Sequence, residues 1–182
     1  MRCLLVVFVA ILLAAAGLMR VDSPAEAAGE GYASGCGEDE VFLYATEKRM
    51  LTLHNVHNDA RKTHGLEPLC VHPALQTAAR AHSKDMIQHH YFSHYSQGNN
   101  EAPCTRIRRS GYAWSSCGEN IGHNATPEDL FRSWMRSSIH QRNILDGGFR
   151  EIGIGAYTGD YNDSETTMYT VDFGAPEEQP SR

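Results

Sequence analysis

The chain has 182 residues and a formal net charge of −6 at pH 7, from 16 lysine and arginine residues against 22 aspartate and glutamate residues. An acidic chain without a basic stripe is not expected to bind nucleic acid, which excludes that class of partner. Without the first 27 residues, about 155 residues remain, which is enough for one domain with its own hydrophobic core.

Residues 1–27 have the pattern of a secretory signal peptide. Met1-Arg2 supplies the charged start, an apolar run extends from Cys3 to Met19, and Ala25-Glu26-Ala27 supplies a small-x-small cleavage site. The pattern predicts a secreted or extracellular protein whose mature chain begins near Ala28 and holds no membrane span. A single membrane anchor stays open as the alternative, because the apolar run approaches the lower limit for spanning a bilayer.

Removal of Cys3 with the signal leaves an even number of cysteines in the mature chain: Cys36, Cys70, Cys104 and Cys117. Four cysteines in an exported chain predict two disulfides, for which three connectivities are open. We favour Cys104 with Cys117 and Cys36 with Cys70. No C-x-x-C spacing occurs, so a structural zinc knot is not expected.

The first half of the mature chain reads as helical. Residues 28–45 form a polar, glycine-rich flexible leader. Helical spacing from about Glu40 to His64 predicts a first helix with an apolar face of Met50, Leu53, Val56 and Ala60. Gly65 and Pro68 then end it. A second helix is predicted from Pro73 to about His90, with a core-facing side made of Leu75, Ala78, Ala79, His82 and Met86.

The second half mixes strands with short helices. Residues 91–103 read as a polar loop, 104–109 as a short helix, and 117–122 as a short buried strand. Thr126 caps a further helix that has Pro127 at its first position. Residues 152–157 and 168–173 predict a hairpin, and residues 175–182 a disordered tail. Helices followed by strands favour an α+β fold, a three-layer α-β-α sandwich.

Glu119 is the first candidate for a functional site. It begins the predicted strand, with Ile121 behind it. A carboxylate buried there needs a hydrogen-bond partner, an ion pair or a metal. His94 and His140 are the candidate partners, and the alternative is that Glu119 is an ion-paired surface residue. His82 faces the core, where a lone histidine is more often a hydrogen-bonded core residue than a metal ligand.

Linked motifs follow one another in a fixed order. The first half holds Asn58-x-x-Arg61-x-x-x-Gly65-Leu66-x-Pro68-Leu69, Ala81-His82-Ser83-x-Asp85-Met86 and Tyr91-Phe92-Ser93-His94. The second half holds Arg106, Gly111-Tyr112, Gly118-Glu119-Asn120-Ile121, Trp134-Met135-x-Ser137, His140-x-x-Asn143-Ile144-Leu145, Ile152-Gly153-Ile154-Gly155 and Asp172-Phe173-Gly174. Together they resemble the CAP superfamily (cysteine-rich secretory proteins, antigen 5, pathogenesis-related 1), also called the SCP domain. The form is most similar to secreted bacterial members, and the resemblance covers residues 46–174.

The resemblance implies an α-β-α sandwich with a central cleft, in which two histidines and two glutamates bind a divalent metal. His94, Glu119 and His140 match three of these positions, and the second glutamate falls on Ser137. A neutral hydroxyl at that position implies weak binding of a cation such as Zn²⁺. We infer that His82 can partly compensate and that Asn143, three residues beyond His140, can orient a cleft histidine, with Ser137 in a supporting role beside the site. The alternative for Asn143 is that it only caps a helix end.

Two function classes stay open. The first is a secreted binding module whose polar cleft takes a metal ion or small ligand, or which binds a lipid or an extracellular partner. The alternative is a metal-assisted hydrolase acting on extracellular protein or cell-wall material. The sequence lacks both an H-E-x-x-H helix and a G-x-S-x-G elbow, and Cys117 is better explained as a disulfide cysteine than as a nucleophile. We therefore favour the binding module, leave open whether the protein is an enzyme, and assign no catalytic residue.

Overall fold

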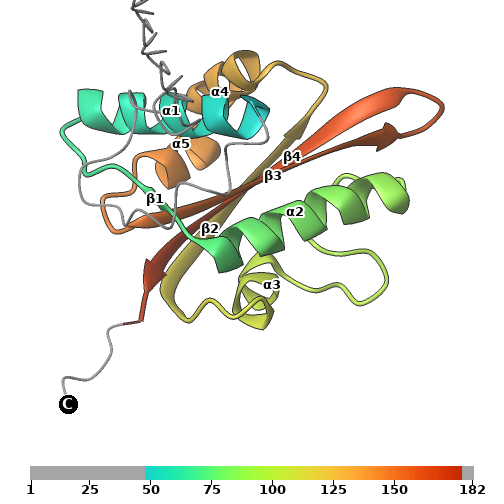
Figure 1. Cartoon of the computed structure of the whole chain (residues 1–182), viewed down its shortest axis with the longest axis horizontal. Coiled ribbons are helices and arrows are strands. Elements are labelled where there is room, and N and C mark those ends of the chain that lie inside the picture. Colours follow the sequence, from blue (N-terminus) through green and yellow to red (C-terminus); the bar gives the residue numbers. More distant parts are fainter. Residues whose placement is uncertain (1–47, 178–182) are drawn as a thin grey trace, which may run out of the picture.

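Four strands form one mixed sheet with helices on both of its faces (Figure 1). The computed structural model describes residues 48–177, so the predicted signal peptide, the leader, Cys36 and residues 178–182 lie outside the described residues. The elements in chain order are α1 (Lys48–Thr63), β1 (Cys70–Val71), α2 (Pro73–Gln88), α3 (Pro103–Arg109), β2 (Trp114–His123), α4 (Pro127–Arg136), α5 (Ser138–Ile144), β3 (Glu151–Asp160) and β4 (Glu165–Pro176).

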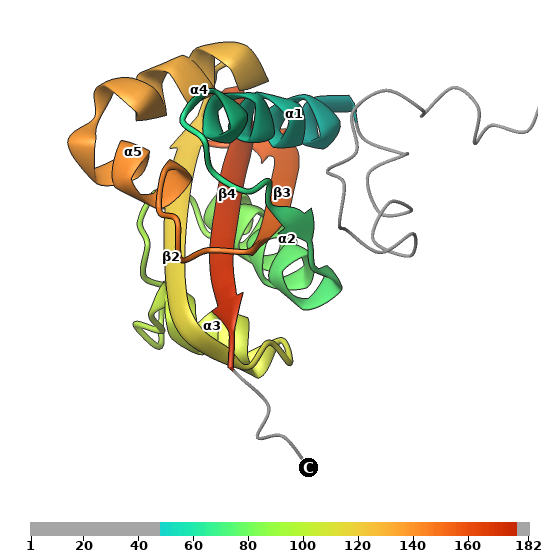
Figure 2. The same cartoon turned by 90° about the vertical axis from the view of Figure 1, so that its left-hand side faces the viewer.

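The sheet has the strand order β1-β3-β4-β2. The short β1 runs parallel to β3, whereas β4 pairs antiparallel with both β3 and β2. Helices α1, α4 and α5 lie over one face, and α2 and α3 lie over the other, as the two views show (Figures 1 and 2). The predicted α+β fold, a three-layer α-β-α sandwich, is therefore confirmed.

The layer between the sheet and α1, α4 and α5 is the main apolar core. Its buried side chains include Leu53 of α1, Trp134 of α4 and Phe173 of β4. The inner face of α1 also buries three polar residues that the apolar pattern did not predict: His54, His57 and Arg61. Val56 and Ala60, which were predicted on that face, are only partly buried. Tertiary hydrogen bonds therefore decide which face of α1 is buried.

On the other face, α2 packs directly against the backbone of β3. A Cβ atom on Gly153 would lie 2.1 Å from the backbone of Leu75, and one on Gly155 would lie 2.3 Å from that of Ala79. Only glycine fits at these two positions, because any side chain would clash with the helix backbone. The predicted inner face of α2, including His82, is buried as expected.

Most predicted elements are confirmed, with differences at short segments. Thr126 caps α4 by accepting from the Asp129 N–H, and Gly65 ends α1 with a φ of 70°. The strand predicted over 117–122 is longer, because β2 runs from Trp114 to His123. The two-residue β1 and the seven-residue α5 were not predicted, since segments so short carry little periodicity.

Candidate functional site

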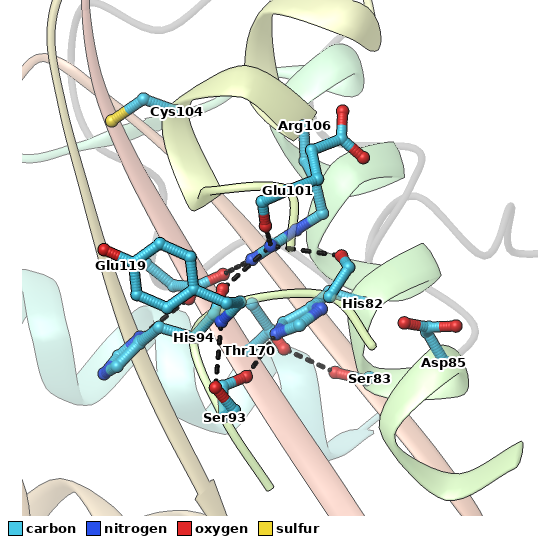
Figure 3. Close-up of polar contacts among 12 residues, drawn as sticks. His82, Ser83, Asp85, Ser93, His94, Glu101, Cys104, Arg106, Glu119 and Thr170 are labelled. Atoms are coloured by element: carbon cyan, nitrogen blue, oxygen red, sulfur yellow. Dashed lines mark hydrogen bonds and ion pairs between the residues drawn. The ribbon is translucent and has the colours of Figure 1, made fainter. Parts of the chain in front are cut away.

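Glu119 of β2 lies at the centre of a buried ionic network (Figure 3). Its side chain is 2% exposed. Arg106 Nη2 donates to Glu119 Oε2 over 2.6 Å, and the Nδ1 of His94 lies 2.8 Å from Glu119 Oε1. Both carboxylate oxygens are thus engaged, which satisfies the requirement for a partner that burial imposes.

Arg106, from α3, fixes the loop that carries His94. Its guanidinium donates to the backbone carbonyls of His94 and Glu101, both over 2.8 Å, in addition to Glu119. One buried cation therefore ties the loop, the helix and β2 together. Arg106 belonged to the recognised motifs but was not predicted as a site residue, because its spacing along the chain does not show where its side chain points.

A disulfide joins the same two elements. Cys104 of α3 is bonded to Cys117 of β2, with their Cα atoms 5.9 Å apart, which confirms the favoured pairing. Cys70 is also disulfide-bonded, and its expected partner, Cys36, lies outside the described residues. The covalent bond and the Arg106–Glu119 ion pair together hold α3 against β2.

Asp172 places a second carboxyl group beside Glu119. The two residues are direct cross-strand partners in the β2–β4 ladder, and Asp172 is 2% exposed. Burial, and then the neighbouring negative charge of Glu119, raises the pKa of Asp172 well above its usual range. The shift favours the neutral form of Asp172, next to the ion pair of Arg106 and Glu119. Asp172 was not predicted as a site residue from the sequence. Its position as an aspartate within the apolar run of 168–173 was the signal that could have identified it.

His94 and His140 present imidazoles at this site. The side chain of His94 is 42% exposed, so the ring leads from the buried carboxylate towards solvent. The pKa of His140 is lowered, first by its partial burial and then by the nearby His94. Because Glu119 can only accept, the neutral His94 ring places its proton on Nδ1 and leaves the Nε2 lone pair available.

Two asparagines position the backbone around these groups. Asn143 of α5 donates to the Glu119 carbonyl over 3.1 Å and to Asn120 Oδ1 over 2.9 Å. Asn120 in turn donates to the His140 carbonyl over 3.1 Å. Asn143 therefore contacts the site through backbone and amide groups. Ser137 is the N-cap residue of α5, where its side chain makes no cap hydrogen bond.

His82 lies beneath the loop as a hydrogen-bonded core residue. It is 1% exposed, and its Nε2 lies 2.9 Å from the Ser93 carbonyl. Its Nδ1 lies 3.5 Å from the Tyr91 hydroxyl, and burial lowers its pKa. Ser93 Oγ accepts from the Tyr95 N–H, so it serves the loop and forms no triad with His94.

The donors fit a metal only in part. Within residues 48–177, no three His, Cys, Asp or Glu side chains are grouped so that they could hold a metal ion together. Both Glu119 oxygens already have partners, and one of these partners is a cation. The donor chemistry that remains is the pair of imidazoles, with Glu119 hydrogen-bonded behind His94. Carboxylates in that position orient a metal-binding histidine and raise its basicity.

Comparison with known proteins gives matches over most of the described residues. Residues 54–173 match the CAP family, described as the cysteine-rich secretory protein family. YkwD of Bacillus subtilis, an uncharacterized protein, is 37% identical over 112 residues, which cover 61% of this chain and 42% of YkwD. YlbC, an uncharacterized membrane protein of the same organism, is 30% identical over 111 residues, which cover 60% of this chain and 31% of YlbC.

Among solved structures, an extracellular protein from Bacillus anthracis that contains an SCP domain has a TM-score of 0.63 and 27% identity. The match covers 78% of this chain and 45% of that chain. The chain thus spans less than half the length of these relatives. No helix among residues 48–177 is long and apolar enough to cross a membrane.

Proposed function

The chain belongs to the CAP family of cysteine-rich secretory proteins, and we propose that it is an exported binding module whose cleft, lined by His94, Glu119 and His140, holds a weakly bound divalent cation such as Zn²⁺. The proposal includes cleavage of the signal peptide at residues 1–27 and a domain over residues 46–174. The extracellular SCP-domain protein of Bacillus anthracis supports export.

The observation that carries the proposal is the hydrogen bond between His94 Nδ1 and Glu119 Oε1. It leaves His94 Nε2 as the proposed metal-binding atom, with Glu119 in the supporting role and His140 as the proposed second ligand. Imidazole nitrogen suits zinc, and the remaining coordination positions stay open to water or a ligand. A zinc ion there would supply a Lewis acid that attracts an anionic group of the ligand.

Two features support weak binding. Ser137 provides no charge at the position where the family pattern has its second glutamate, and Arg106 neutralises Glu119. Ordinary structural zinc sites use four protein ligands, whereas this cleft offers two imidazoles. The same features favour a binding module over a metal-assisted hydrolase, because Glu119, the carboxylate bonded to His94, is also paired with Arg106 and is therefore a poor general base.

Isothermal titration of zinc into the full mature chain tests the proposal. We expect one weak site that is lost in His94→Gln and in His140→Gln. Glu119→Gln should weaken binding about 10-fold, as expected when the hydrogen-bond partner of a metal-binding histidine is altered. His64→Gln, at an exposed residue directly after α1, is the matched control and should bind zinc as the unaltered chain does.

Two results would contradict the proposal. Zinc binding that persists in the His94→Gln/His140→Gln double variant would place the metal elsewhere. Zinc-dependent turnover in a panel of peptide and cell-wall substrates, abolished by His94→Gln, would favour the hydrolase instead.

A further inference from the structure

Four side-chain rings form a strip at the end of the molecule where α2 ends and β3 turns into β4 (Figure 1). His90 stacks on Tyr161, with ring centroids 6.2 Å apart and an angle of 21° between the ring planes. His123 lies 6.4 Å from Tyr161 and 4.7 Å from Phe92, again between centroids. His90, Phe92 and His123 are exposed, and Tyr161 is half-buried. These four residues, here called the ring strip, extend to within two residues of His94.

Local backbone geometry brings part of this strip together. Between β3 and β4, Tyr161 and Ser164 are hydrogen-bonded to each other through their backbones, and Asn162 and Asp163 have φ values of 53° and 63°. A two-residue turn of this kind favours asparagine and aspartate. His90 follows the C-cap of α2 with a φ of 52°, at a position that usually holds glycine. Its Nδ1 accepts from the Asn162 N–H, which joins the end of α2 to the turn.

The ring strip combines apolar ring faces with polar ring edges. Phe92 is its one exposed, entirely apolar side chain, whereas the other three rings carry a nitrogen or a hydroxyl. Because Nδ1 of His90 accepts a hydrogen bond, Nε2 of the neutral ring carries the proton and can donate. The imidazole of His123 and the hydroxyl of Tyr161 can each donate and accept. A ligand on this surface therefore needs both apolar faces and hydrogen-bonding groups.

A sugar has this combination. The C–H groups on one face of its ring can pack on an aromatic ring, and the hydroxyls around its rim can bond to polar ring edges. A lipid would bury those edges without hydrogen-bond partners, which is costly. The net charge of −6 of the chain disfavours a nucleic acid. Since successive ring centroids lie 4.7 to 6.4 Å apart, the strip is longer than one sugar ring and suits an oligosaccharide.

We propose that the ring strip binds an uncharged oligosaccharide. The faces of successive sugars pack on the rings of Phe92, His123 and Tyr161, and sugar hydroxyls bond to the imidazole and phenol edges. The exposed side chains of Asn162 and Asp163 provide further hydrogen-bonding groups at the turn end of the strip. Binding is non-covalent and needs no metal, so it is independent of the proposed zinc site.

Calorimetric titration of the full mature chain tests this site. The probes are two β-1,4-linked tetrasaccharides, one of glucose and one of N-acetylglucosamine, and we expect saturable binding of at least one. Phe92→Ala and His123→Ala should each weaken binding about 5-fold, because one ring contact is lost. Both residues are exposed, so the variants should fold. Tyr95→Ala is the matched control: it removes a ring that is 51% exposed and lies outside the strip, and the affinity should stay unchanged.

Four outcomes would overturn the proposal. The first is no saturable binding of either tetrasaccharide up to its solubility limit. The second is binding that Tyr95→Ala weakens as much as Phe92→Ala, which would place the sugar outside the strip. The third is binding that appears only when zinc is added, which would assign the sugar to the metal cleft. The last is self-association that Phe92→Ala abolishes and the sugars do not reverse, which would assign the strip to a second copy of this chain.

Discussion

Two buried arginines lie on opposite sides of the sheet and differ in the groups to which they donate hydrogen bonds. Arg61 of α1 is fully buried and donates only to backbone carbonyls, those of Glu67, Ile144, Asp146 and Phe149. Arg106 of α3 is 4% exposed and donates to two carbonyls, but its shortest bond is to the carboxylate of Glu119. Arg61 joins backbone segments, whereas Arg106 also fixes a charged group that holds a half-exposed imidazole.

The difference shows how a buried arginine relates to function. Carbonyl acceptors belong to the backbone, so a network made of them stabilises a fold and presents no reactive side chain. A carboxylate acceptor has a second oxygen, and in Glu119 that oxygen orients His94. The arginine on the α1 side of the sheet therefore has a structural role only, whereas Arg106 on the α3 side also supports the candidate site.

Replacement of Arg61 should have the largest effect on stability. Arg61→Met leaves several buried carbonyls without donors and should lower the free energy of unfolding by about 5 kcal/mol. Urea denaturation measures this loss. The exposed Arg132→Gln is the control, with an effect within about 0.5 kcal/mol. A loss for Arg61→Met as small as that of the control would remove the structural role assigned to Arg61.

Replacement of Arg106 should cost less stability but should also affect the site. Arg106→Met leaves Glu119 buried without its cation, for a loss of about 4 kcal/mol. Adding Glu119→Gln should recover at least about 1 kcal/mol, because the unpaired charge is gone. A double-mutant cycle by urea denaturation measures the coupling, and additive losses would contradict the pairing. Among folded variants, Arg106→Met should weaken zinc binding, and Arg61→Met should not.

The dependence of stability on pH should come in large part from His57, a buried histidine of α1. His57 is fully buried, and its Nε2 has no hydrogen-bond partner. Burial lowers its pKa to about 4, so the unfolded chain binds the proton more readily. Stability is then full above about pH 6.5 and falls as the pH drops towards 4, by about 3 kcal/mol from this residue.

Thermal or urea unfolding between pH 7 and 4 tests this expectation. His57→Leu should show a smaller loss of stability over that window than the unaltered chain. The exposed His64→Leu is the control and should keep the full loss. Since burial also lowers the pKa of His54 and His82, part of the pH dependence should remain in His57→Leu. Equal losses in both variants would show that His57 is not the source.

Replacement of Asn143 should have the smallest effect. Asn143→Ala removes the bonds to the Glu119 carbonyl and to Asn120, for a loss of about 1 kcal/mol. Through Asn120 it should also disturb His140, seen as a shift of the His140 ring signals in NMR spectra and as weaker zinc binding. If stability alone changes, Asn143 acts on the backbone and does not position the site.

The sequence by itself determined the main elements and the sandwich, and it favoured the disulfide between Cys104 and Cys117 that the structure confirms. Thr126 and Gly65 act through local backbone geometry, which a linear pattern records. The motif spacing also indicated that His94 and Glu119 belong together, and the structure brings them to hydrogen-bond distance. Whether His94 and His140 hold a metal stays a prediction.

Only the tertiary structure decided which polar residues are buried and what they contact. Glu119 lies on β2, whereas Arg106 comes from α3 and Asp172 from β4. No local spacing along the chain therefore relates the three residues. The buried face of α1 is set in the same way, by carbonyls 83 to 88 residues away that accept from Arg61. Helix and strand periodicity arises between neighbours in sequence, whereas a buried charge is stabilised by whatever the fold places beside it.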